Sequence, residues 1–467
     1  MIAALLLAGV AVGAICLLRW RLGLLLTLAV GFLQDPVRKL LPGKPVAMVV
    51  AVAAFFAICV LGIILEGQRL PFRRLARWYP GLAAPAMLLL VIVVLQTVHT
   101  LLATANLVLA GIGLLAYLSP PIALLAGEKY ALRFPDIRRW VLVYLAGALV
   151  VAVTVAAEYA GVESPLFTPI WGGLVHGAGG SVRMFNGVMR TPEIAAWHLA
   201  AGACLLATWT VAARTRRVRW LGGVGTAFLV AVIFLTGRRK MLGELALFTL
   251  LFTLLVVQDR RGSSRILQLG GAALLAAVLG GQLFQSGEHA PVGGYVERGL
   301  SVVTDSVERL NTMTIGMFRW IVLRNGFFGT GAGTGAQGAQ HFGGGAQLVG
   351  GAAEGGVGKV LAELGVPGLL VLLWLFVVGG RTLLRVARFA RRAPSHEALR
   401  IYGLVAFLPA NAAVFLTAHQ VFGDPFVLIV LGLVTGSVLA YPRIWQQRQA
   451  YLERARRRAA ATAAEAA

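Results

Sequence analysis

The sequence predicts an all-α protein that crosses a membrane about twelve to fourteen times, and three observations support this prediction. The chain of 467 residues is 58% hydrophobic but only 13% charged, whereas a soluble domain carries about 25% charged residues. Several apolar runs reach roughly 20 residues, the length of a helix that crosses a hydrocarbon core of about 30 Å. The short alternating segments of a transmembrane barrel are absent, so the spanning elements should be helices.

About thirteen apolar segments carry this prediction. They lie at residues 1–18, 22–34, 45–65, 83–98, 101–126, 140–160, 194–213, 219–236, 241–257, 265–284, 357–379, 400–418 and 425–441. The second segment is short, and the break near His99 is weakly marked, which leaves twelve or fourteen spans open.

The distribution of Lys and Arg predicts the orientation of these segments. With the thirteen segments above, the most basic connections all face one side, which the positive-inside rule assigns to the cytoplasm. These connections and the tail are residues 69–77, 129–139, 214–219, 260–265, 381–400 and 454–458. Retention of basic loops in the cytoplasm therefore explains the net charge of +23. A lipid bilayer is expected as a partner, and nucleic acid is not.

The same topology divides the chain into four parts. They are transmembrane helices over 1–284 with an external loop at 161–193, an extracytoplasmic Gly-rich loop at 285–356, C-terminal transmembrane helices over 357–441, and a basic cytoplasmic tail at 442–467. The large loop has an amphipathic, helix-like stretch near Val296–Leu323, and fourteen of the thirty-three residues from Gly326 to Gly358 are Gly. It is either a flexible external loop or one whose backbone approaches a ligand closely.

Basic residues at several places on the external face oppose the positive-inside pattern, and four of them are arginines in two segments. Arg183 and Arg190 lie in the loop at 161–193, and Arg238 and Arg239 form a tight turn between two spans. An anionic ligand would compensate for this placement, because guanidinium groups bind phosphate bidentately. The alternative is contact with lipid phosphates at the membrane surface.

Few acidic residues and histidines accompany these arginines. Glu193 follows Thr191-Pro192 in a pattern typical of a helix start, while Glu354 and His341 lie in the Gly-rich loop and Glu363 lies inside the following span. Glu244, near the start of another span, is either a functional carboxylate or a local partner of Lys240. No metal-ligand spacing and no nucleotide-binding motif is present, so neither metal nor cofactor is expected.

Three segments occur in an order that resembles the O-antigen polymerase and O-antigen ligase superfamily over roughly residues 180–380. They are Arg183-Met-Phe-Asn-Gly-Val-Met-Arg-Thr-Pro-Glu193, Phe234-Leu-Thr-Gly-Arg-Arg-Lys240, and the region from Glu308-Arg309 to Glu354-Gly-Gly-Val-Gly-Lys-Val-Leu-Ala-Glu-Leu-Gly365. Members of that superfamily are integral membrane glycosyltransferases, so the resemblance implies a GT-C-like helical fold.

The chain keeps part of the family pattern and departs from it elsewhere. The positions that keep it are Gly187, Pro192, Glu363 and Gly365, with an Arg in the turn. Glu193 replaces an Asn, the turn that begins at Thr236 lacks the family Ser, and Glu354 falls where the family has a His.

The resemblance implies a metal-independent, inverting transfer of an undecaprenyl-pyrophosphate-linked oligosaccharide to an acceptor sugar. Its pyrophosphate would be bound by Arg183, Arg190, Arg238 and Arg239. Arg239 and Glu354 would be catalytic, with Glu354 as the base, and the supporting residues would be Glu193, His341 and Glu363. Glu193 or His341 could instead be the base.

The implied setting is the bacterial inner membrane, with the active face toward the periplasm, in O-antigen or exopolysaccharide biosynthesis. Polysaccharide export or chain-length proteins would be further partners. The alternatives are a lipid-linked oligosaccharide flippase or transporter, which should show internal repeats and broken helices at the membrane midplane, and a non-catalytic subunit of a polysaccharide assembly machine.

Overall fold

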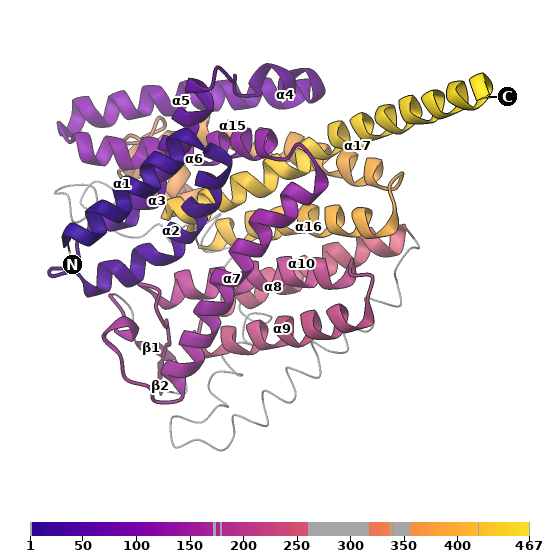
Figure 1. Cartoon of the computed structure of the whole chain (residues 1–467). Helices are drawn as coiled ribbons and strands as arrows, with labels where there is room; N and C mark the ends of the chain where they lie inside the picture. The colour runs from indigo at the N-terminus through magenta and orange to yellow at the C-terminus, as the bar shows by residue number, and fades with distance from the viewer. Residues whose placement is uncertain are drawn as a thin grey trace.

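The computed structural model describes residues 2–170, 174–177, 180–259, 317–336, 339, 355–418 and 420–466, most of which are helical (Figure 1). The longer helices are α1 (Ile2–Leu18), α2 (Trp20–Leu40), α3 (Ala51–Leu65), α5 (Pro80–Thr104), α6 (Leu107–Tyr130), α7 (Phe134–Tyr159), α8 (Pro192–Val211), α9 (Arg216–Leu235), α10 (Arg239–Gln258), α15 (Gly356–Ala390), α16 (Ser395–Thr417) and α17 (Pro425–Ala466). The shorter elements are α4 (Phe72–Trp78), α13 (Met317–Asn325), the 3-10 helices η1 (Val46–Val50), η2 (Pro165–Phe167) and η6 (Val421–Gly423), and the strands β1 (Leu174–Gly177) and β2 (Gly180–Arg183).

Ten helices in the described part of the chain are long and apolar enough to cross a membrane. The protein is therefore a multi-pass helical membrane protein. Twelve of the thirteen predicted apolar segments lie on helices, and the segment at 265–284 lies outside the described residues. The break expected near His99 lies six residues later, because α5 continues to Thr104 and the chain turns at Ala105, where φ is 51°.

Burial separates central helices from lipid-facing ones. In their most apolar 18-residue windows, α17 and α8 are 89% and 83% buried, whereas the corresponding values for α5 and α9 are 17% and 22%. Helices α5 and α9 expose large apolar side chains such as Leu95 and Leu221, which would be unfavourable in water. In a bilayer, lipid covers those outer surfaces instead.

One short hairpin was not predicted. Strands β1 and β2 pair antiparallel within the loop at 161–193, with Leu174 opposite Arg183 and Gly177 opposite Gly180. The hairpin leads the chain directly into the segment from Met184 to Thr191, which precedes α8.

Helix α15 is interrupted at Gly365, where φ is 69° and ψ is −171°. A Cβ atom here would lie 2.4 Å from the carbonyl oxygen of Phe327, so the conformation and the close approach both require Gly. Residues 366–380, before the basic residues that begin at Arg381, continue the helix for about 22 Å at 1.5 Å per residue. This is less than a core of about 30 Å, so the break lies within the apolar part of α15, in the half that begins at Gly356.

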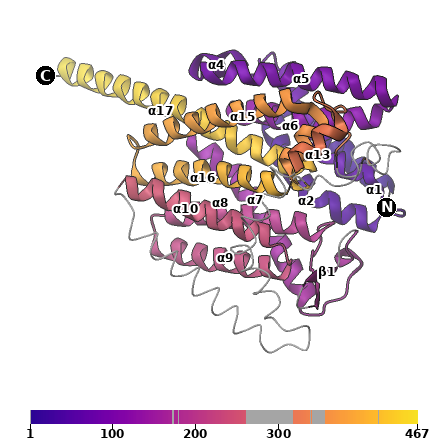
Figure 2. The ribbon, with the colours of Figure 1, turned by 180° about the vertical axis from the view of Figure 1, so that it is seen from behind.

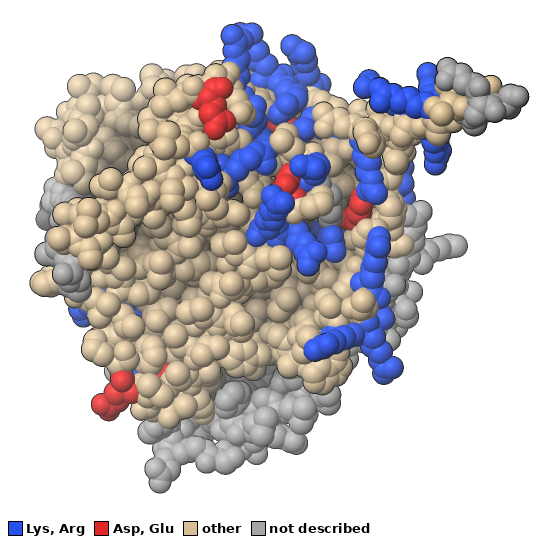
Figure 3. Space-filling view, in the orientation of Figure 1, with Lys and Arg blue, Asp and Glu red and all other residues tan. Residues whose placement is uncertain are grey.

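The connections between helices gather at two opposite ends of the bundle. At the first, which we call the basic end, Glu128 of α6 accepts a hydrogen bond from Arg443 of α17 (3.1 Å) and pairs with Arg74 of α4. Tyr402 of α16 donates to Asp259 there. Lys and Arg side chains crowd toward this end, where α4 and the tail of α17 lie (Figures 1 and 3). The opposite end, with the connections 40–46, 159–192, 235–239 and 418–425, is called the cluster end.

Candidate functional site

The cluster end assembles an outer polar cluster from five parts of the chain. Its members are Asp35, Arg38 and Lys39 at the end of α2, Glu158 at the end of α7, Arg183, Asn186, Arg190 and Glu193 around the start of α8, Arg238 and Arg239 at the start of α10, and Asp424 before α17. Asp35, Glu158, Asn186, Glu193 and Asp424 are all buried.

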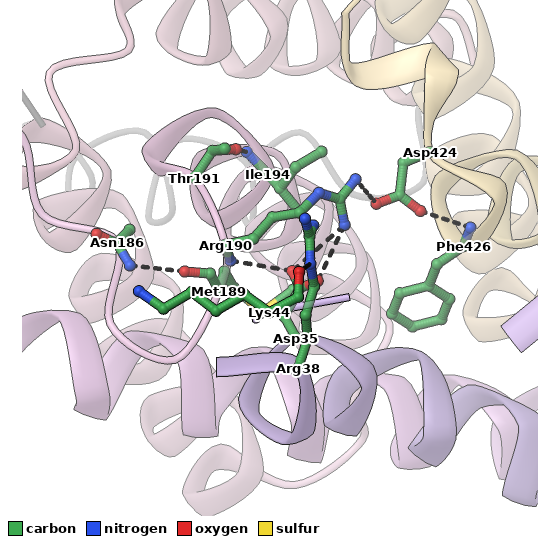
Figure 4. A network of polar contacts seen from close by, with 10 residues as sticks. All are labelled: Asp35, Arg38, Lys44, Asn186, Met189, Arg190, Thr191, Ile194, Asp424 and Phe426. Atoms are coloured by element: carbon green, nitrogen blue, oxygen red, sulfur yellow. Dashed lines mark hydrogen bonds and ion pairs between the residues drawn. The ribbon is translucent and has the colours of Figure 1, made fainter. Parts of the chain in front are cut away.

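Arg190 lies at the centre of the cluster, between two aspartates (Figure 4). Its guanidinium donates to Asp35 Oδ1 (3.1 Å) and to Asp424 Oδ2 (2.6 Å), and its backbone N–H donates to Asp35 Oδ2 (3.0 Å). Burial alone would lower the pKa of Arg190, but the charges of Asp35 and Asp424 outweigh burial and raise it above its usual range. Arg190 therefore stays charged and joins α2, the segment before α8, and the start of α17.

Local chemistry positions both partners of this arrangement. Thr191 Oγ1 accepts from the N–H of Ile194 and caps α8, with Pro192 in the first turn, as the sequence predicts. Asp424 Oδ1 accepts from the N–H of Phe426 (2.7 Å) at the start of α17. The two helix starts therefore face each other across one ion-paired arginine.

Lys39 extends the cluster toward α7. It lies beyond the apolar segment of α2, and its ammonium donates to the carbonyl oxygens of Leu166 (2.6 Å) and Gly187 (2.9 Å). Burial lowers the pKa of Lys39 to about 8, although the charges of Asp35 and Glu158 oppose this shift. Arg38 is buried beside it and donates to the Lys44 carbonyl oxygen (3.0 Å).

Glu158 holds the segment that leaves the hairpin. Its Oε2 accepts from the backbone N–H groups of Asn186 (2.9 Å) and Gly187 (2.7 Å), and its Oε1 lies 3.8 Å from Arg183 Nη2. Gly187 has a φ of 54°, and a Cβ there would lie 2.6 Å from Thr154 Oγ1. Gly187 is thus required by a tight turn against α7.

The arginine turn packs against this segment. The N–H of Phe185 donates to the Leu235 carbonyl oxygen (3.2 Å), and Gly237, with a φ of 64°, lies against Met184. Arg238 precedes α10, and its Nε is buried without a hydrogen-bond partner among the described residues. A buried guanidinium N–H without an acceptor is a group that an anionic ligand would satisfy.

Glu193, expected as a supporting residue, is buried in the first turn of α8. Gln420, with its amide nitrogen turned toward Glu193, donates to both carboxylate oxygens (2.7 and 3.1 Å). Through this contact the connection between α16 and α17 is joined to α8, next to the pair between Arg190 and Asp424.

Glu363 lies in a different cluster. It is fully buried and accepts from Tyr117 Oη (2.6 Å) and the N–H of Gly335 (3.0 Å), with Lys359 Nζ 3.5 Å away. Within the described residues its hydrogen bonds join α6, α15 and the segment 329–335, and none reaches the outer polar cluster. Glu354 and His341 lie outside the described residues.

Sequence reasoning missed Asp424, Glu158 and Asp35 as parts of the site. The available signal was that each of these three acidic residues lies at the border of an apolar segment, where ionisable residues are candidates for a function. Glu244 differs from the local pair considered with Lys240: it is buried, its Oε1 accepts from Asn411 Nδ2 (2.8 Å), and its Oε2 has no partner in the described part of the chain.

A scan against protein-family models and a search of curated proteins both gave no match for this chain.

Proposed function

We propose that this protein is a glycosyltransferase that moves an oligosaccharide from a polyprenyl pyrophosphate to an acceptor sugar at the outer leaflet of the bacterial inner membrane. The observation that carries the proposal is the outer polar cluster, in which basic side chains from α2, the segment before α8, and the turn before α10 lie at one end of the bundle. The positive-inside rule supports placing that end outside, because the basic end carries most of the connecting Lys and Arg residues.

A pyrophosphate fits this end on grounds of charge and geometry. Arg183 is 67% exposed and its carboxylate partner is 3.8 Å away, while Arg238 has a buried N–H without an acceptor. Two phosphates beside these groups would gain charge-assisted hydrogen bonds. Asp35 and Asp424 already balance the charge of Arg190, so Arg190 would contact phosphate only by giving up part of its pairing with Asp424.

The proposed reaction needs a base and charge stabilisation. The acceptor hydroxyl attacks the anomeric carbon, the bond from that carbon to the pyrophosphate oxygen breaks, and the hydroxyl proton passes to a base. Arg183, Arg238 and Arg239 would stabilise the charge on the departing pyrophosphate. The family resemblance makes Glu354 the proposed base, with Glu193 and His341 as alternatives; the contacts of Glu193 with Gln420 make it less available for this role.

Reconstituted protein tests the proposal. Purified protein in liposomes is supplied with undecaprenyl-pyrophosphate-linked repeat units and no nucleotide, and new glycosidic bonds are measured by mass spectrometry. The proposal expects new bonds that are lost in Arg239→Ala and Glu354→Gln. Arg217→Ala, an exposed arginine at the basic end, is the matched control and should retain activity.

A lipid-linked oligosaccharide flippase or transporter is the second candidate, and the interruption of α15 favours it, because broken helices are common in transporters. The outer polar cluster, by contrast, lies where the helices end and not at a helix break, which favours a surface site. Movement of the lipid between leaflets without new bonds would overturn the transferase proposal in favour of this candidate. If neither new bonds nor lipid movement is observed, the result would favour a non-catalytic subunit of an assembly machine.

A further inference from the structure

The short helix α13 exposes large apolar side chains on one face. Trp320 and Phe318 are exposed on it, as is Leu323, which is 76% exposed. The following residues Phe327 and Phe328 are exposed as well. Large apolar side chains gathered in this way are unfavourable in water at about 25 cal/mol per Å².

The opposite face of α13 is fixed to the bundle. Ile321 is completely buried and packs in one cluster with Val360, Leu361 and other residues of α15. Beyond the helix, the Phe327 carbonyl oxygen accepts from the N–H of Val366 (2.9 Å), and the Phe328 carbonyl oxygen accepts from Gln96 Nε2 (2.7 Å). The packing of Ile321 and these two hydrogen bonds after the helix therefore hold α13 against α15 and α5.

These contacts also place α13 along the bundle. Gln96 lies eight residues before the end of α5 at Thr104, a distance of about 12 Å along the helix. Val366 directly follows the break in α15, about 37 Å of helix away from its other end. Helix α13 thus lies against α15 on the side of the bundle, toward the cluster end (Figure 2). The neighbouring end of α5 is lipid-facing, with Leu102 80% exposed.

Two exposed arginines lie on the same helix. Arg319 and Arg324 form no ion pair within the described residues, and the guanidinium of Arg324 lies 5.4 Å from the centre of the Trp320 ring. Aromatic side chains beside arginines are the composition of the boundary between lipid tails and phosphate headgroups. The side chain of Asn325, which ends the helix, is buried with neither amide atom paired in the described structure.

We infer that α13 is an interfacial helix that binds the bilayer leaflet at the cluster end, with Trp320, Leu323, Phe327 and Phe328 among the acyl chains. Arg319 and Arg324 bind the phosphates of anionic lipids there, because an anionic surface attracts basic side chains that lie close to it. This inference concerns bulk membrane lipid and does not depend on the proposed transferase activity.

Site-directed spin labelling tests where α13 lies. The native thiols, Cys16, Cys59 and Cys204, are buried. A nitroxide can therefore be attached selectively to Leu323→Cys, with Leu102→Cys as the lipid-facing reference and Ala459→Cys in the exposed tail as the water reference. In vesicles of phosphatidylcholine and phosphatidylglycerol, the label at 323 should be relaxed more strongly by oxygen than by a water-soluble nickel chelate, as at 102. Relaxation like that at 459 would overturn the inference.

The same label tests the arginines. Replacing phosphatidylglycerol by phosphatidylcholine should raise the nickel accessibility of the label at 323, and Arg319→Gln with Arg324→Gln should abolish this dependence on anionic lipid. The pair Arg454→Gln with Arg456→Gln in the tail is the matched control and should leave the dependence unchanged. If the label at 323 has the same nickel accessibility in both lipid mixtures in the protein that keeps Arg319 and Arg324, anionic lipid is not the partner.

Discussion

The guanidinium of Arg190 donates a 2.6 Å hydrogen bond to the carboxylate of Asp424, although 234 residues separate them in the chain. Asp35, from a third part of the sequence, accepts a second hydrogen bond from the same guanidinium, with 3.1 Å between Arg190 Nη1 and Asp35 Oδ1. Both aspartates have almost no exposed surface. Arg190 therefore stabilises both charges by ion pairing, because an unpaired buried charge is very costly.

Replacing Arg190 should consequently destabilise the protein. In Arg190→Ala two buried carboxylates lose their ion-paired guanidinium, and the free energy of unfolding should fall by about 3–5 kcal/mol. The measurement is chemical or thermal unfolding of the purified protein in detergent.

A combined variant separates buried charge from lost packing. Asp35→Asn, Arg190→Gln and Asp424→Asn together remove all three charges and keep similar shapes, so much of the lost stability should return. Arg183→Ala is the control, because that side chain is 67% exposed and should contribute about 1 kcal/mol or less. An Arg190→Ala protein as stable as the parent would contradict this account of the cluster.

The sequence predicted local features of the fold better than distant contacts. The start of α8 at Thr191 and Pro192 was predicted correctly, because capping depends on a few adjacent residues. The end of α5 was misplaced, because His99 interrupts the apolar pattern without interrupting the helix. The actual boundary depends on the left-handed conformation of Ala105 and on the Asn106 side chain, which caps α6.

The candidate site was predictable only in part, for the same physical reason. Arg183, Arg190 and Arg238 were identified because they violate a charge rule that can be read along the chain. Asp424 and Glu158 could not be assigned as partners, since one sequence does not show which ends of distant helices meet. The site roles of the predicted residues remain predictions.

Lys39 predicts a specific dependence of stability on pH. Its pKa in the folded protein, about 8, lies below the ordinary value of 10.5, so the unfolded chain binds this proton more tightly than the folded protein does. The cost of the buried charge is full below pH 8 and is relieved as pH rises toward 10.5. At about 1.4 kcal/mol per pKa unit, the relief amounts to about 3 kcal/mol at most.

Unfolding of the parent and of Lys39→Gln, measured in detergent from pH 7 to pH 10, checks this prediction. The free energy of unfolding of the parent should rise with pH relative to that of the variant, which has no ammonium to titrate. A difference between the two proteins that stays constant over this range would show that the buried charge does not titrate there.

Glu363 should control the order of the segment 329–335. Glu363→Ala leaves the Gly335 N–H, the Tyr117 hydroxyl and the Lys359 ammonium without their shared partner. Hydrogen exchange, measured by mass spectrometry, should therefore speed up in this segment, and Glu363→Gln should show a smaller effect because it keeps an acceptor. Glu66→Ala, which removes a hydrogen-bond partner of Trp20 at the basic end, is the control and should leave exchange in the segment 329–335 unchanged.

Arg238 offers the sharpest separation of function from stability. Its buried Nε has no partner to lose among the described residues, so Arg238→Ala should leave the unfolding temperature close to that of the parent. If the proposed pyrophosphate binds there, glycosyl transfer should fall by about a hundredfold or more, the usual effect of removing one donor to developing negative charge. The transfer rate of Arg238→Lys should lie between those of the parent and Arg238→Ala, because an ammonium keeps the charge but not the planar pair of donors. The rate of bond formation in liposomes is the measurement, with Arg217→Ala as the control. Full activity in Arg238→Ala would show that Arg238 does not bind the pyrophosphate. Arg183 and the basic residues at the end of α2 would then be the candidate anion-binding groups.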